Sequence, residues 1–178
     1  MNITVETTSM TATTGTLKMG EHAFPCTLGR AGVIPAADKV EGDGKTPLGT
    51  YPLRRVLYRA DRRPQPATSL PVEVLAPDTG WCEDPTHIDY NKQVKLPHPS
   101  VVDQMTREDE VYDYVVILGH NDDPVVKGLG SAVFMHLARP DFTPTAGCVG
   151  LRRDDLLKVL SLCDASTTIT ILPPVDSR

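Results

Sequence analysis

The chain has 178 residues, the usual size of one domain, and its composition does not shift abruptly enough to mark a second. Hydrophobic residues make up 40% and charged residues 23%, which is typical of a folded globular protein rather than a disordered one. The net charge is -5, and no basic stripe is present that could follow a phosphate backbone, which argues against a nucleic-acid partner. We therefore expect one domain over residues 1–178, with a core of about 15–173.

Apolar runs are too short for a membrane span, because none approaches the roughly 20 residues that cross a bilayer. The first fifteen residues lack the basic start and the apolar stretch of a secretory signal. We expect a protein without a membrane span and without a visible signal peptide.

The four cysteines show neither a CxxC pair nor the Cys/His spacing of a structural zinc site. We therefore expect no metal and no other cofactor. If Cys148 stays a free thiol for chemistry, at most one disulfide can form among Cys26, Cys82 and Cys163, and the sequence does not choose its partners.

Short apolar runs separated by 16 prolines and 13 glycines predict a strand-rich, mostly β domain. Residues 14–19 and 23–28 flank a polar Gly-Glu-His step and predict an opening hairpin. Residues 39–53 suit a loop between strands, with a turn at Asp43, and residues 61–69 suit an exposed loop.

Two later segments predict central strands that carry histidines. Residues 112–120 are almost wholly apolar at their centre, and residues 131–136 repeat that character. These strands place His120 and His136 at their C-terminal ends, where rigid elements commonly hold catalytic groups.

One helix is predicted after Cys148. Leu156, Leu157, Leu160 and Cys163 recur at helical spacing, and acidic residues stand near the helix start. Residues 167–172 predict a final strand.

A histidine and a cysteine in this part of the chain suggest nucleophilic chemistry. His136 ends a strand, and the loop that follows leads to Thr145-Ala-Gly-Cys148. A thiol with a pKa of about 8.5 needs a nearby base to become a nucleophile, and Gly147 allows a tight turn that aims N–H groups at an oxyanion. A buried structural cysteine remains the ordinary alternative for such a pair.

Five segments in order resemble the YkuD-type L,D-transpeptidase family, in its short single-domain branch. They are KVEGDGKTPLGTY, GWCEDPTHIDYNKQVKLP, YDYVVILGHNDDP, GSAVFMHL and PTAGCVGL, and the resemblance spans about residues 17–172. It implies a sandwich of mixed β-sheets with one main helix, with Cys148 as nucleophile and His136 as general base. The N–H groups of Gly147 and Cys148 would form the oxyanion hole, and no metal is needed.

The resemblance also implies a reaction on peptidoglycan. The thiolate would attack a stem tetrapeptide at its third residue, diaminopimelate, release D-Ala, and pass the acyl group to the amine of a second stem. The linkage could join two third residues, or the first residue of one stem to the third of another. The resemblance further implies a periplasmic or cell-envelope location and a covalent carbapenem adduct on Cys148. Two alternatives are a cysteine carboxypeptidase or amidase on the same scaffold and a non-catalytic wall-binding domain.

The chain departs from the commoner family signature at two positions, with Ala146 in place of a histidine and Gly150 in place of an arginine. Arg152 or Arg153 could supply the missing positive charge to a substrate carboxylate, although a solvated charge at a helix start is an equal alternative. The residues expected to contact substrate are Arg152, Arg153, Thr145, His120, Asn121 and Tyr90. For His120, hydrogen-bonded structure is the simpler explanation, and Trp81 is expected to pack in the core with its indole N–H bonded.

Overall fold

The computed structural model describes residues 1–175, and these form a mostly β fold with one α-helix, as the sequence predicts. The elements in chain order are β1 Ile3–Glu6, β2 Thr14–Met19, β3 His22–Thr27, β4 Val33–Pro35, the 3-10 helix η1 Ala36–Asp38, β5 Thr46–Tyr58, β6 Val72–Val74, β7 Thr79–Cys82, β8 Gln93–Lys95, β9 Val102–Gln104, β10 Tyr114–Leu118, β11 Phe134–Leu137, β12 Val149–Leu151, α1 Arg153–Leu162 and β13 Thr168–Ile171. No helix within residues 1–175 is long and apolar enough to cross a membrane.

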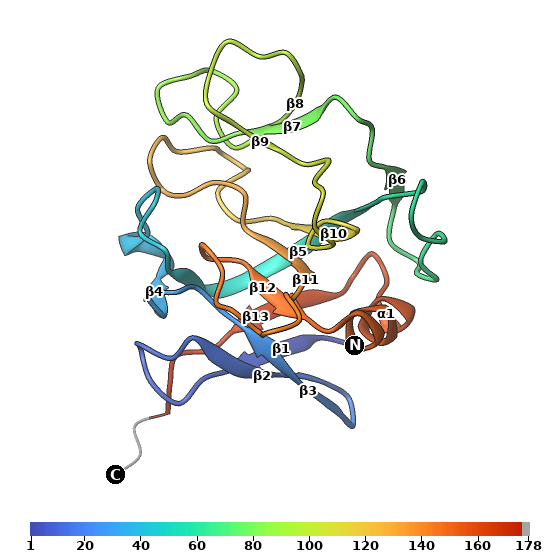
Figure 1. The fold of residues 1–178 in the computed structure, drawn as a ribbon. Helices are drawn as coiled ribbons and strands as arrows, with labels where there is room; N and C mark the ends of the chain where they lie inside the picture. The colour runs from blue at the N-terminus through green and yellow to red at the C-terminus, as the bar shows by residue number, and fades with distance from the viewer. Residues whose placement is uncertain (176–178) are drawn as a thin grey trace.

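The larger sheet is mixed and joins its two layers through one long strand. Its order is β10-β11-β12-β3-β2-β1-β13-β5-β4, and β10 also pairs with β5. Strand β5 is 13 residues long, so its first part pairs with β13 and its second part pairs with β10. The result is the predicted sandwich-like arrangement, in which the β1–β3 layer faces the layer of β10 and β11 (Figure 1).

An apolar core fills the space between these layers. All five residues of β10 are buried, which is the expected result for an apolar run covered on both faces. Helix α1 contributes Leu156, Val159 and Leu160, which lie on one face of the helix because they are spaced three and four residues apart. Packed structure begins at Ile3 in β1, earlier than the expected core start near residue 15, because β1 pairs with both β2 and β13.

A three-stranded sheet of order β8-β7-β9 lies on the far side of β5 and β10 from the β1–β3 layer (Figure 1). We call residues 79–113, which contain this sheet, the cap. A second apolar cluster joins the cap to the larger sheet, and Trp81, Tyr112, Phe134 and Cys148 belong to it. Trp81 is buried and its indole N–H donates to Asn91, which confirms the expectation for this residue.

The predicted hairpin is confirmed as β2 and β3, but the arrangement of the two histidine-bearing strands differs from a simple reading of the sequence. Strands β10 and β11 are antiparallel, with Val115 opposite His136. His120 is five residues beyond Val115, so the two histidines are separated by about 16 Å at 3.3 Å per strand residue. His120 and His136 therefore lie at opposite ends of the strand pair.

Candidate active site

The pairing of β11 with β12 brings Cys148 and His136 to one face of the larger sheet. The two strands run parallel, with Met135 opposite Val149 and His136 opposite Gly150. Cys148 directly precedes β12, and its Sγ accepts a hydrogen bond from the Phe134 N–H at 3.4 Å. Because side chains alternate along a strand, Phe134 and His136 share a face. Cys148 and His136 line the same cavity, of about 280 Å³.

The Cys148 thiol is a protonated group in the resting protein. The residue is 8% exposed, and its Sγ donates to the Ala132 carbonyl at 3.1 Å. Burial raises the pKa of Cys148 to about 12, although the Phe134 N–H acts in the opposite direction. Removal of this proton therefore requires a base and a change in the surroundings of the sulfur.

His136 is buried as a neutral base. Its Nδ1 lies 2.9 Å from the Leu137 carbonyl, an acceptor, so Nδ1 carries the proton and Nε2 has a free lone pair. Burial, together with the charges of Arg107 and Arg139, lowers the pKa of His136 to about 4. Within residues 1–175 the thiol bonds to Ala132 rather than to His136, so the resting site holds two neutral partners and not a thiolate–imidazolium pair.

The loop before Cys148 is fixed by its own side chains and by the residue that precedes β5, Lys45. Gly147 has a φ of +140°, and a side chain there would meet the Lys45 carbonyl at 2.9 Å, so glycine is required. Thr145 Oγ1 accepts from the Gly147 N–H at 3.0 Å and donates to the Cys148 carbonyl at 2.7 Å. Of the two expected oxyanion donors, the Gly147 N–H is thus engaged in the loop, whereas Thr145 makes its bond to Cys148 at the carbonyl and not at the N–H.

The presence of glycine rather than arginine at position 150 has a steric explanation. It lies opposite Thr27 of β3, and a Cβ at position 150 would be 2.2 Å from Thr27 Oγ1. An arginine cannot occupy position 150 while Thr27 holds this place. Among residues 1–175 the Thr27 hydroxyl is buried without a hydrogen-bond partner, and it lines the cavity of Cys148 and His136.

Positive charge reaches this cavity from other arginines. Arg30, Arg107 and Arg139 line it, and none of its lining residues is an aspartate or glutamate. We call it the basic cavity. Arg152 and Arg153 line an adjoining cavity of about 530 Å³, which shares Arg139 with the basic cavity. The Arg152 guanidinium stands 4.6 Å above the Phe142 ring.

Three of the expected substrate contacts make internal hydrogen bonds; His120 and Tyr90 are buried, and Asn121 is half-buried. His120 Nε2 lies 2.9 Å from the Leu129 carbonyl, and the Asn121 amide donates to the carbonyls of two loop residues. The Tyr90 hydroxyl donates to Glu41 at 2.8 Å. Among the described residues, none of these three is part of the lining of the two cavities that Cys148 borders, whereas Thr145 does line the basic cavity.

Asn91, next to Tyr90, has a larger role than its place in the sequence indicates. Its Oδ1 accepts from Trp81 Nε1 and from the Ala132 N–H, each at 3.0 Å. The Ala132 carbonyl in turn accepts a hydrogen bond from the Cys148 thiol. Asn91 therefore connects the cap to Ala132, the residue whose carbonyl holds the nucleophile.

A second cavity, of about 300 Å³, lies on the other side of Cys148, and its charges are mostly negative. Glu41, Glu83 and Asp103 line it, and Lys39 and Arg107 are its cations. We call it the acidic cavity. Sequence reasoning missed Lys39 and Glu41 because their segment suits a turn, and it missed Glu83, Asp103 and Arg107 because no local pattern marks them. The available signal was the strength with which that segment resembles the family.

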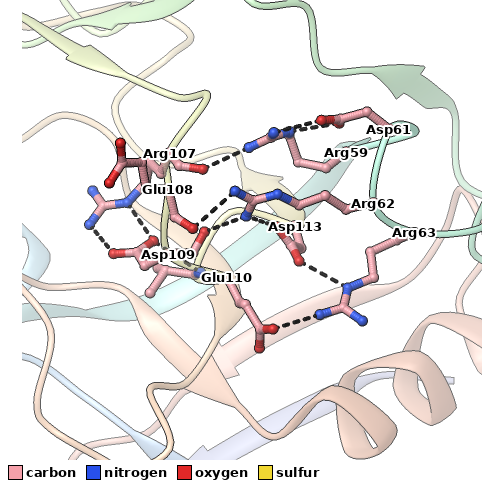
Figure 2. Close-up of polar contacts among 10 residues, drawn as sticks. Arg59, Asp61, Arg62, Arg63, Arg107, Glu108, Asp109, Glu110 and Asp113 are labelled. Carbon is pink, nitrogen blue, oxygen red and sulfur yellow. Dashed lines mark hydrogen bonds and ion pairs between the residues drawn. The ribbon is translucent and has the colours of Figure 1, made fainter.

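An ion-pair network fixes the segment that enters the site from the cap (Figure 2). Asp113 is fully buried and accepts from Arg62 at 3.1 Å and from Arg63 at 2.9 Å. Arg59 donates to the Arg107 carbonyl at 2.8 Å. The segment 61–69 is thus a loop, as predicted, but its first residues are bound to the cap rather than free on the surface. The network positions Arg107 and Tyr112, which line both cavities.

One group of side chains has the spacing of a metal site. Ligand atoms of His87, Asp89 and His98 lie within 4.8 Å of one another in the cap. The Asp89 N–H donates to His87 Nδ1 and the Ser100 N–H donates to His98 Nδ1, so His98 Nε2 carries the proton directed at Asp89. These bonds fit a hydrogen-bonded loop better than a set of metal ligands.

Comparison with known proteins gives one match. The family model of the YkuD L,D-transpeptidase catalytic domain matches residues 3–171, nearly the whole chain. No curated protein and no solved structure matches the chain.

Proposed function

The chain belongs to the YkuD family of L,D-transpeptidase catalytic domains, and from this premise we propose that it is a peptidoglycan L,D-transpeptidase that uses Cys148 and His136. The observation that supports this most directly is the common face of Cys148 and His136 on two paired strands, with both side chains in one cavity. The tautomer of His136 adds to it, because a proton on Nδ1 leaves Nε2 able to accept one.

In the first half-reaction the donor is a tetrapeptide stem. As the stem enters, the Cys148 proton passes to His136 Nε2, and the sulfur attacks the carbonyl of diaminopimelate at the third position. The C–N bond to D-Ala breaks, His136 returns the proton to the leaving amine, and a thioester remains. A neutral Cys148 and a neutral His136 suit this order of steps, because the thiol proton moves only when the developing negative charge is stabilised.

The oxyanion of this step would be bound by N–H groups of the Cys148 loop. The Cys148 N–H is the first candidate because Thr145 does not engage it. The Gly147 N–H can join only by releasing Thr145 Oγ1, so we expect this loop to adjust in the acylation step.

Carboxylates of the donor stem fit the basic cavity. Arg30 and Arg139 are exposed guanidinium groups beside His136, and the buried Thr27 hydroxyl offers one further donor. A guanidinium binds a carboxylate through two parallel hydrogen bonds. Arg152 and Arg153, in the adjoining cavity, would contact a more distant part of the same stem. Since this substrate lies outside the inner membrane, we propose a periplasmic or cell-envelope location.

The test is to incubate purified tetrapeptide muropeptide with the wild-type protein and with Cys148→Ala, and to separate the products by liquid chromatography and mass spectrometry. We expect dimers from the wild type and a loss of about a thousandfold or more in Cys148→Ala. Fragmentation of the dimer identifies a third-to-third or a first-to-third linkage. Cys82→Ala is the matched control, because Cys82 is also buried and is not among the residues that line either cavity.

Other products would change the assignment. Shortened monomers that depend on Cys148, without dimers, would make the protein a carboxypeptidase or amidase. Equal behaviour of wild type and Cys148→Ala would leave a wall-binding domain. The intact mass after incubation with a carbapenem provides a second readout, in which we expect an adduct on wild type and Cys82→Ala but not on Cys148→Ala.

A further inference from the structure

Cys148 separates two cavities of opposite charge. Arginines line the basic cavity, on the side of His136, and carboxylates line the acidic cavity, on the side of the cap. The boundary between the cavities is formed by Cys148 itself together with Arg107, Tyr112 and Ala146, which line both. A reaction at the sulfur can therefore receive one molecule from each side.

Two of the acidic side chains are directed at the nucleophile from the cap. Trp81 of β7 lies opposite Asp103 of β9, so these two share a face of the cap sheet. Glu83 follows two residues after Trp81 and continues the same face. Trp81 and Cys148 belong to one apolar cluster, so this face of the cap is turned toward the sulfur.

Most charged groups of the acidic cavity already have partners. Asp103 accepts from the Tyr112 hydroxyl at 2.6 Å, and Glu41 accepts from Tyr90 and Ser131, each at 2.8 Å. The two cations are also neutralised, because Lys39 pairs with Asp43 and Arg107 pairs with Asp109.

Glu83 differs from these groups. Its carboxylate makes no hydrogen bond or ion pair with residues 1–175, although it is more than half buried. Burial, together with the charges of Asp103 and Glu41, raises the pKa of Glu83 to about 7. A carboxylic acid with such a pKa exchanges protons readily near neutral pH.

The same carboxylates act against the first half-reaction. The charges of Asp103 and Glu83 raise the pKa of the Cys148 thiol, so they oppose formation of the thiolate. A cation bound between them and the sulfur would remove this opposition. The arrangement is explained if the group that belongs in the acidic cavity is positively charged.

We propose that the acidic cavity binds the amine-bearing acceptor stem and that Glu83 is a catalytic residue of the second half-reaction, which receives a proton from the acceptor ammonium. This inference rests on the proposed function, and it deepens that function by assigning a site and a base to the acceptor. The selection of an amine over water then depends on Glu83.

The step balances as follows. The acceptor ammonium transfers one proton to the Glu83 carboxylate and becomes a free amine. The amine nitrogen attacks the thioester carbonyl, the C–N bond forms, and the C–S bond breaks to release the Cys148 sulfur. The second proton lost by the nitrogen passes to that sulfur, which restores the thiol, and Glu83 later returns its own proton to solvent.

The experiment measures how the acyl-enzyme divides between transfer and hydrolysis. A tetrapeptide donor is incubated with an acceptor stem that bears a free amine, and the ratio of dimer to hydrolysed tripeptide is determined for the wild type and for Glu83→Gln. Glutamine keeps the shape but cannot take the proton, so we expect the ratio to fall about tenfold or more. Glu83→Asp should recover part of the ratio. Glu21→Gln, on the exposed turn between β2 and β3, should not change it.

Acylation is followed in parallel as the rate of the carbapenem adduct on Cys148. We expect it in Glu83→Gln to be equal to or faster than in the wild type, because a charge that opposes the thiolate is removed. An unchanged ratio in Glu83→Gln, with normal acylation, would overturn the inference and leave the proposed function intact. A wild-type protein that forms neither adduct nor acyl-enzyme would overturn both.

Discussion

The interior of the larger sheet and the cap are held together by different forces. Inside the sheet, residues such as Val116, Met135 and Leu156 are fully buried among other apolar groups. The cap is joined to the sheet by the second apolar cluster and also by directed contacts, in which Asn91 bonds to Ala132 and Asp113 bonds to two arginines. Apolar burial is strong but has no direction, whereas hydrogen bonds and ion pairs fix positions.

This difference between the larger sheet and the cap shows which region supplies each property that the site needs. The larger sheet supplies the stability and the register that place Cys148 beside His136. The cap adds charged side chains near the sulfur, among them Arg107 and Glu83. Changes in the first region should therefore act on stability, whereas changes in the second should also alter activity.

The largest effect on stability should come from the sheet interior. Leu156 of α1 is fully buried in the main core, and Leu156→Ala should lower the free energy of unfolding by about 2–5 kcal/mol. Urea unfolding measures the loss, and carbapenem acylation of the folded fraction should keep its rate. Val101→Ala, at an exposed position of the cap, is the control and should stay within about 0.5 kcal/mol. A slower acylation of folded Leu156→Ala would show that the two regions are not separable.

A smaller loss should follow when the cap is detached from the sheet. Asp113→Ala leaves Arg62 and Arg63 without their buried partner, and we expect a loss of about 3 kcal/mol. Here activity should fall as well, because the network holds Arg107 through its carbonyl (Figure 2), and Arg107 lines both cavities.

The control for this change is Asp122→Ala, which breaks an ion pair with Arg54 on the surface and should cost below about 1 kcal/mol. Limited proteolysis should cut the segment 104–112 faster in Asp113→Ala than in Asp122→Ala. Equal cleavage in the two variants would contradict a role of Asp113 in holding the cap.

The two regions also differ in how far the sequence predicts them. Alternation and apolar runs predict the hairpin of β2 and β3, the buried strand β10 and the face of α1, because these features depend on local burial. The resemblance to the family supplied Cys148 and His136, which the structure places in one cavity.

The residues that the sequence does not predict are those whose position depends on distant partners. Glu83 and Asp103 meet only through the pairing of β7 with β9, and Arg30 reaches His136 only through the loop after β3. Tyr90 and His120, expected at the substrate, are instead buried by contacts with residues about 40 and 9 positions away in the chain. No local pattern encodes such contacts, and turn chemistry explains Asp43 equally well without a site.

The smallest effect on stability should come from His136, which lies at the boundary between the larger sheet and the cap. Its pKa is lowered by burial from 6.5 to about 4, so the unfolded chain binds a proton here before the folded protein does. Stability contributed by this group is complete above pH 6.5 and is lost as the pH falls through the interval from 6.5 to 4. At pH 5 the loss relative to pH 7 is about 2 kcal/mol.

Urea unfolding of wild type and His136→Gln at pH 7 and pH 5 isolates this contribution, because glutamine does not titrate and all other groups are shared. We expect the wild type to lose about 2 kcal/mol more than His136→Gln between the two values. His87→Gln, in the cap loop, is the control and should follow the wild type. If His136→Gln and wild type lose the same amount, then His136 is reached by water as a cap residue would be, and the boundary lies deeper in the sheet than the structure places it.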